Sequence, residues 1–88
     1  MELSSSDIQG VFQDLIAGRI SREDADRWAY ARMQAFDSND LSFNPKVDEE
    51  LLWDAVQYLY GIDTKVSPDE YMHSIDDIET EYQSRWKS

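Results

Sequence analysis

Apolar residues recur near the start of the chain at the spacing of an α-helix. Ile8, Phe12 and Leu15 are separated by four and then three positions, so they would share one helical face. The sequence Ser-Asp-Ile-Gln that begins at Ser6 has the form of a capping box, which marks a helix N-terminus. Gly18 is the residue type that most often ends a helix in a left-handed conformation. We therefore predict a first helix between Ser6 and Gly18.

A second helix is predicted to begin directly after the first. Ser21 and Asp24 have capping-box spacing, and the acid also suits the positive end of the helix dipole. The apolar residues that follow have helical spacing: Ala25, Trp28, Ala29, Met33 and Phe36. Because so few residues link the two helices, we predict that they form an antiparallel αα-hairpin.

The second half of the chain contains two more helical patterns. One begins at Pro45, a residue favoured in the first turn, or a few residues later, and it ends at Gly61. The other begins after Ser74, which can cap it, and Arg85 and Lys87 suit its negative C-terminal end. Each pattern has an apolar face that we expect to point into the core.

The segments between these helices are predicted to be irregular. Residues 37–44 form a polar loop, and we expect Leu41 and Phe43 within it to pack against the core. Residues 67–70 resemble a helix start, but residues 71–74 interrupt the periodicity. We interpret that region as a single turn or an irregular segment.

The fold class predicted from these patterns is all-α, a compact four-helix domain that begins with the αα-hairpin. The 88 residues are enough for one domain with a single modest core. No alternating apolar run of strand length occurs, so no sheet is expected. The single domain covers residues 1–88, and its helices are predicted near residues 6–17, 21–36, 45–60 and 74–86.

Sequence features that direct a protein out of the cytoplasm are not found. Residues 1–6 lack the basic and apolar stretches of a signal peptide, and no apolar run approaches the length of a membrane span. The chain has no cysteine, so it can form neither a disulfide nor a thiolate metal site. We expect a soluble, cytoplasmic protein.

Negative charge is concentrated in the second half of the chain. Residues 1–36 carry six acidic residues against four arginines, whereas residues 37–84 carry thirteen acidic residues against two lysines. The formal net charge is −11. Such a surface attracts a basic partner and repels nucleic acid, whose phosphates need lysine and arginine. The charge predicts a basic protein partner and no nucleic acid. Arg32, beside the core positions of the second helix, is expected to be a structural ion-pair partner.

The residues that catalysis would need are scarce. The chain has one histidine, no cysteine and no glycine-rich phosphate loop, so we predict no enzyme, no catalytic residue, no cofactor and no metal. His73 precedes Asp76 and Asp77 at helical spacing, but a helix capped by Ser74 would leave it outside. We expect a surface or hinge histidine.

A serine after the second predicted helix allows a different role. Ser38 follows an aspartate, as does the serine that acyl carrier proteins load with phosphopantetheine. That motif needs Leu or Met after the serine and a helix that starts there, whereas Asn39 follows here. A carrier-type protein modified at Ser38 is kept as a lesser alternative to a plain polar loop.

The third predicted helix suggests a binding surface. Trp53 and Tyr60, seven residues apart, share one flank beside Glu49, while Glu50, Asp54 and Gln57 point away from the core face. Aromatic residues beside carboxylates are typical of an interface with an Arg- or Lys-rich partner. The alternative, that residues 71–86 cover both aromatics as core, stays open. The predicted partner-binding residues are the acids and aromatics of the second half: Asp48, Glu49, Glu50, Trp53, Asp54, Tyr60, Asp63, Asp69, Glu70, Tyr71, Asp76, Asp77 and Glu79.

A pattern of helix and loop residues extends over roughly residues 7–60. Its members are Phe12, Leu15–Ser21, Asp24, Ala25, Arg32, Asp40–Ser42, Asn44 and Glu49–Ala55. In this pattern the chain resembles the colicin D-type immunity proteins, small helical bacterial proteins that bind and block a cognate toxin nuclease. The last third of the chain matches poorly.

This resemblance implies an immunity protein that binds the catalytic domain of a cognate ribonuclease or tRNase toxin and blocks its substrate channel. An acidic inhibitor can imitate the phosphate backbone that such a toxin binds. The main alternative is a small acidic adaptor or structural domain with an unrelated protein partner, whose binding an apolar patch should dominate.

Overall fold

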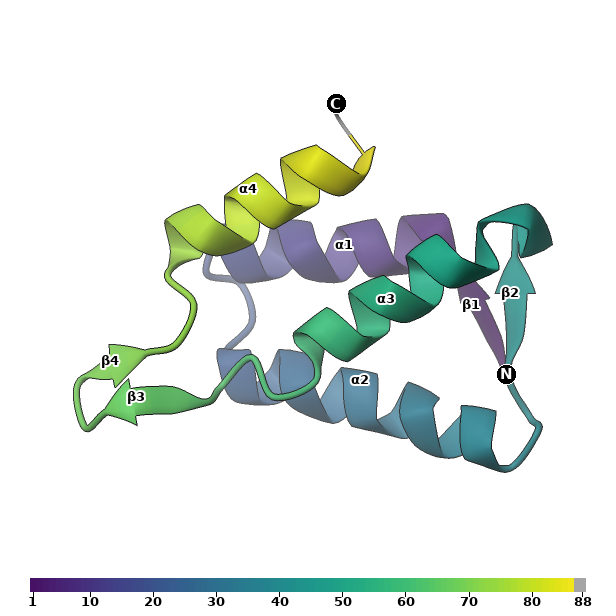
Figure 1. Ribbon diagram of the computed structural model, residues 1–88, viewed down its shortest axis with the longest axis horizontal. Helices are drawn as coiled ribbons and strands as arrows, with labels where there is room; N and C mark the ends of the chain where they lie inside the picture. Colours follow the sequence, from purple (N-terminus) through teal and green to yellow (C-terminus); the bar gives the residue numbers. More distant parts are fainter. Residues whose placement is uncertain (87–88) are drawn as a thin grey trace.

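The computed structural model describes residues 1–86 and shows four helices and two small sheets (Figure 1). The elements in chain order are β1 (Glu2–Ser4), α1 (Ser5–Ile16), α2 (Arg22–Asp37), β2 (Ser42–Asn44), the 3-10 helix η1 (Lys46–Asp48), α3 (Glu49–Leu59), β3 (Lys65–Ser67), β4 (Glu70–Tyr71) and α4 (Ile75–Trp86). The mostly helical, four-helix architecture is confirmed, but the all-α prediction is wrong because of the strands. The predicted role of Lys87 lies outside the described residues.

The first two helices begin with capping boxes. Ser21 and Asp24 cap α2 as predicted, because each side chain accepts a hydrogen bond from the other's backbone N–H. The cap of α1 is Ser4 and not Ser6, with Asp7 as its reciprocal partner. Three serines in a row offered several start points, and the one that has an acid three residues later caps the helix.

The helix ends use the predicted glycines. Gly18 has φ +77° and Gly61 has φ +80°, a region that residues with a Cβ rarely adopt. The N–H of Gly61 also donates a hydrogen bond of 2.6 Å to Asp26 Oδ1, so α2 holds the end of α3. Ser74 and Asp77 form the same reciprocal pair at the start of α4 as the other two caps.

The first sheet joins the start of the chain to the loop after α2. β1 pairs in parallel with β2, with Leu3 opposite Phe43, and the Leu3 side chain is fully buried. A parallel pair needs a crossover connection, which α1 and α2 provide. The expectation that Leu41 and Phe43 pack on the core is confirmed, although Phe43 does so from a strand.

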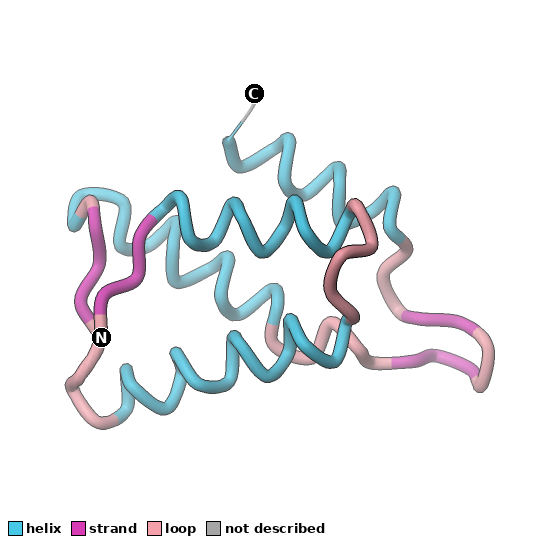
Figure 2. Tube along the Cα trace, turned by 180° about the vertical axis from the view of Figure 1, so that it is seen from behind, coloured by secondary structure: helices cyan, strands magenta, loops and turns pink. Residues whose placement is uncertain are grey.

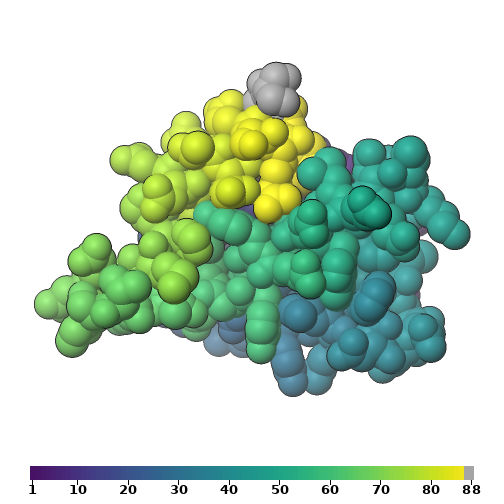
Figure 3. Space-filling view, viewed as in Figure 1, coloured from purple at the N-terminus to yellow at the C-terminus, as the bar shows by residue number. Residues whose placement is uncertain are grey.

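The second sheet is a short hairpin, where a turn or irregular segment was predicted. β3 and β4 pair antiparallel across Pro68 and Asp69, and this β3–β4 hairpin projects from one end of the molecule (Figure 3). Strands of two and three residues are too short to show an alternating apolar pattern in the sequence.

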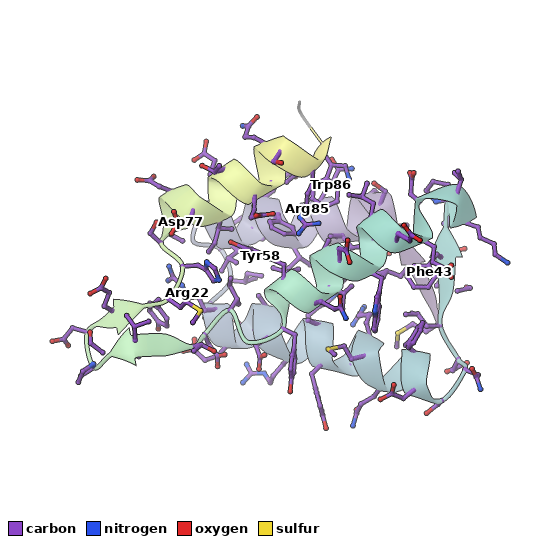
Figure 4. All side chains as sticks on the ribbon, viewed as in Figure 1. Arg22, Phe43, Tyr58, Asp77, Arg85 and Trp86 are labelled. Carbon is purple, nitrogen blue, oxygen red and sulfur yellow. The ribbon has the colours of Figure 1, made fainter. Side chains whose placement is uncertain are left out.

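The core is organised around one aromatic side chain of α1. Phe12 is fully buried, and its ring lies within 6.0 Å, centroid to centroid, of Tyr58, Tyr82 and Trp86. These partners come from α3 and α4, and Figure 4 shows Tyr58 and Trp86 between those helices. The apolar face expected for the last helix does point into the core, where Ile78 and Tyr82 of α4 are buried.

The predicted αα-hairpin is not confirmed as a packing unit. The short link runs through residues 17–21, and Figure 2 shows α1 and α2 running in opposite directions. However, α1 packs mainly against α4, and α2 packs mainly against α3. Within residues 1–86, no helix combines the length and the apolar character that a membrane crossing needs.

Candidate functional site

The aromatic residues predicted on the third helix face α2. The ring of Trp53 stacks on that of Phe36 at a centroid distance of 4.3 Å, and Tyr60 stacks on Tyr30 at 6.2 Å. We call these four residues the aromatic seam. Tyr30, Phe36 and Tyr60 each remain nearly half exposed, at 48%, 43% and 47%. Trp53 and Tyr60 are therefore packed against α2 and not under the last third of the chain.

A pocket opens at one end of the aromatic seam. It lies where the last turn of α2, strand β2 and the first turn of α3 meet, and its volume is about 200 Å³. Its lining combines three aromatic side chains with two carboxylates: Phe36, Phe43, Trp53, Glu49 and Glu50. The sequence placed Trp53 beside Glu49 but had Glu50 pointing away, and it missed both phenylalanines, because these come from other elements.

The remaining predicted site residues lie on several elements. They are spread over α3 and the turns beside it, the β3–β4 hairpin and the first half of α4: Asp48, Asp54, Asp63, Asp69, Glu70, Tyr71, Asp76, Asp77 and Glu79. Asp77 caps α4, so part of its hydrogen-bonding capacity is used within the fold. Tyr71 is half-buried beneath the guanidinium of Arg22, 4.0 Å from its ring centroid.

Four of the five arginines lie on α2 and the turn before it, although α2 itself carries three arginines against four acidic residues. Residues 15–36 contain four arginines against three acidic residues, the reverse of the balance in the whole chain. Two of these arginines form exposed ion pairs, Arg19 with Asp14 at 2.7 Å and Arg27 with Asp24. Four interactions with Ser21 and Arg27, the largest being the hydrogen bond from the Ser21 backbone, lower the pKa of Asp24.

One side of α2 is exposed and carries no acid between Glu23 at its start and Asp37 at its end. Residues 27–36 form the longest stretch of the chain without Asp or Glu. Within it Arg27, Tyr30 and Gln34 are exposed, and Gln34 Nε2 donates a 3.0 Å hydrogen bond to the Tyr30 hydroxyl. We call these three residues the outer face of α2. This face was not predicted from the sequence, although the gap in acidic residues was a visible signal.

Arg32 lies on the opposite side of α2 from this face, beside the buried Ala25 and Ala29, and does not form the predicted ion pair. Its guanidinium lies 4.2 Å from the Trp28 ring centroid, and its buried Nε has no hydrogen-bond partner. Burial lowers the pKa of Arg32, an effect that Asp7 partly opposes. Among the described residues, no carboxylate lies within ion-pair distance of Arg32.

The lone histidine belongs to a packed cluster between α3 and α4. The His73 ring lies 5.1 Å from that of Tyr58, and the Arg85 guanidinium lies 5.8 Å from the Tyr58 ring centroid. Figure 4 shows Tyr58 and Arg85 close together. Burial, then the charges of Glu81 and Asp77, raise the pKa of Tyr58 to about 12. Among residues 1–86, no group of three or more potential metal-ligating side chains occurs.

Comparison with known proteins gives the family. The sequence profile described as "YxzC DNA-binding protein" matches residues 3–86. The chain belongs to this family. It is also 33% identical over 66 residues to the uncharacterized protein YxzC of Bacillus subtilis (strain 168), a match that covers 75% of the chain and 48% of that protein. The chain thus spans about half the length of this relative. No solved structure matches it significantly.

The family overturns the functional predictions made from the sequence. The resemblance to colicin D-type immunity proteins is wrong, because the matching profile is that of a different family. Without this resemblance, the immunity function and its toxin partner lose their support, and so do the adaptor and carrier alternatives. The carrier alternative also lacks its helix, since Ser38 ends α2 and starts no new one. The exclusion of nucleic acid conflicts with the description of the family as DNA-binding.

Proposed function

We propose that the chain binds DNA along the outer face of α2. The family description supports DNA as the ligand. The location of the binding surface is inferred from the acid-free stretch 27–36. This stretch presents Arg27 and Gln34 outward in a chain of net charge −11. Arginine and glutamine are the side chains that bind guanine and adenine edges in the major groove.

The arrangement of the helices supports this orientation. α2 forms one side of the molecule and α4, with its acidic residues, forms the opposite side, with α1 and α3 between them (Figures 1 and 2). A negative far side and an arginine-bearing near side would orient the chain with α2 toward the phosphates.

The proposed interface is short. Ten residues of helix extend over about 15 Å, or about four base pairs of duplex. The acids elsewhere prevent the chain from following the phosphate backbone further. The proposal is therefore a binding role through one helix, without catalysis. It implies that the chain acts in the cytoplasm, where a bacterium keeps its DNA.

Fluorescence anisotropy with a labelled duplex at low salt tests the proposal. We expect the unmodified chain to bind and Arg27→Glu to weaken binding by about tenfold or more, because it removes a base or phosphate contact and adds repulsion. Lys46→Glu makes the same charge change away from α2 and should stay within about twofold. Circular dichroism would establish that both variants fold. Failure of the unmodified chain to bind, or equal weakening by both variants, would overturn the proposal.

A further inference from the structure

The pocket at the end of the aromatic seam has two ring planes at right angles. The Phe43 and Trp53 rings meet at 89° with centroids 6.4 Å apart, while Phe36, which also lines the pocket, stacks on Trp53 at 25°. The faces of aromatic rings carry negative electrostatic potential, and indole is the strongest of the three aromatic types. Two walls at this angle surround a rounded apolar group better than a flat one.

The charged residues of the pocket have one sign. Glu49 and Glu50 line it in the first turn of α3, both are exposed, and no lysine or arginine lines it. Carboxylates and ring faces together favour a positive ligand. Anions are excluded by the same charges, and a neutral ligand would gain only the apolar contact.

The volume and the lining restrict the kind of cation. About 200 Å³ is below the roughly 300–1,000 Å³ of pockets for drug-sized molecules, so one small group fits. A primary ammonium is strongly hydrated and would lose that hydration against the rings. A bare metal ion needs several oxygen ligands in a defined geometry, which two exposed glutamates do not provide. A methylated ammonium has low hydration and an apolar surface that suits both the rings and the carboxylates.

We propose that this pocket binds a trimethylammonium group. Phe43 and Trp53 contact the methyl groups, and Glu49 and Glu50 supply the opposite charge at the opening. The group can belong to a free small molecule or to a trimethylated lysine side chain, since both present the same chemistry. The proposal stands independently of DNA binding, although Phe36 connects the pocket to the C-terminal turn of α2.

Isothermal titration calorimetry with choline and with 3,3-dimethyl-1-butanol tests the chemistry. The second compound has the same shape without the charge, so we expect choline to bind roughly tenfold or more tightly. Glu50→Gln should weaken choline binding several-fold, whereas Asp54→Asn, the same change one helical turn along α3, should not. Equal affinity for the two compounds, no choline binding, or equal loss in the two variants would overturn the proposal.

Two further measurements complete the test. Phe43→Leu removes one ring wall and should abolish choline binding. The melting temperature of the variant establishes that it still folds. Retained choline binding would count against the site. A peptide with trimethyllysine, compared with the same peptide with unmodified lysine, distinguishes the sources. Tighter binding of the methylated peptide than of choline would identify a lysine side chain as the ligand, and the reverse would identify a free small cation.

Discussion

The guanidinium of Arg22 lies 4.0 Å from the centroid of the Tyr71 ring, so the first residue of α2 holds the last strand of the β3–β4 hairpin. Arg22 also donates a 3.3 Å hydrogen bond to the backbone carbonyl of His73. Lys65 approaches the same ring at 5.2 Å. Tyr71 was predicted to bind a partner, but in the structure it lies between two cations of its own chain.

Arg22→Ala should loosen the hairpin more than the rest of the fold. The planar guanidinium stacks on the ring and bonds the carbonyl at once, which lysine cannot reproduce, so Arg22→Lys should rescue only in part. Hydrogen–deuterium exchange of residues 65–73 measures this effect. Arg19→Ala, which removes an exposed ion pair with Asp14, serves as the control and should leave exchange in the hairpin unchanged.

Two buried tyrosines should respond in opposite ways to loss of the hydroxyl. The Tyr58 hydroxyl is buried with no hydrogen-bond partner, so Tyr58→Phe should leave the free energy of unfolding unchanged or raise it by about 1–3 kcal/mol. The Tyr82 hydroxyl accepts a 2.8 Å hydrogen bond from Gln13 Nε2, so Tyr82→Phe should lower it by about 0.5–1.5 kcal/mol. Urea denaturation compares the two, and a clear loss in Tyr58→Phe would contradict this account.

The raised pKa of Tyr58 predicts a loss of stability at high pH. The folded chain holds the phenol proton more tightly than the unfolded chain, so this contribution is complete below about pH 10. It is lost as the pH rises through the folded pKa of about 12. The free energy of unfolding should therefore fall more steeply between pH 10 and 12 in the unmodified chain than in Tyr58→Phe. If the free energies of unfolding of the two proteins fall in parallel with pH, the Tyr58 hydroxyl does not contribute to the loss of stability.

The position of the α1 N-cap within the run of three serines can be tested by mutation. Ser4→Ala removes the acceptor for the Asp7 N–H and should lower the free energy of unfolding by about 1 kcal/mol. Ser6→Ala removes only a side-chain contact with Ser4 and should cost less. Thermal unfolding of the two variants measures the difference. A larger loss in Ser6→Ala would move the cap to the position that the sequence suggested.

The salt dependence of DNA binding should be shallow if α2 alone makes the contact. Each neutralised phosphate contributes a slope of about −0.9 in a plot of log affinity against log salt. The four arginines of residues 15–36 therefore limit the slope to roughly −4. Anisotropy titrations at several salt concentrations measure it. A much steeper slope would require a second basic surface and would contradict binding through α2.

Local features of the fold were readable from the sequence because their causes lie within a few residues. The cap of α2 depends on Ser21 and Asp24, and the ends of α1 and α3 depend on glycines with positive φ. Hydrophobic periodicity located the four helices for the same reason. The misplaced cap at Ser6 is a local error of two residues, among serines of equal propensity.

Contacts between distant residues were decided only by the tertiary structure. Leu3 pairs with Phe43 forty positions away, and neither three-residue strand carries a pattern of its own. The sequence placed Trp53 on one flank of its helix but left open which element covers it, and the fold brings Phe36 and Phe43 to that flank.

The functional prediction failed for a related reason. A net charge summed over the chain hides where the charges lie, whereas a partner meets only one face at a time. The sequence determined the composition and spacing of α2, including its acid-free stretch. Only the packing of α2 against α1 and α3 determined that Arg27 and Gln34 point outward, because burial of the opposite side of the helix fixes its rotation.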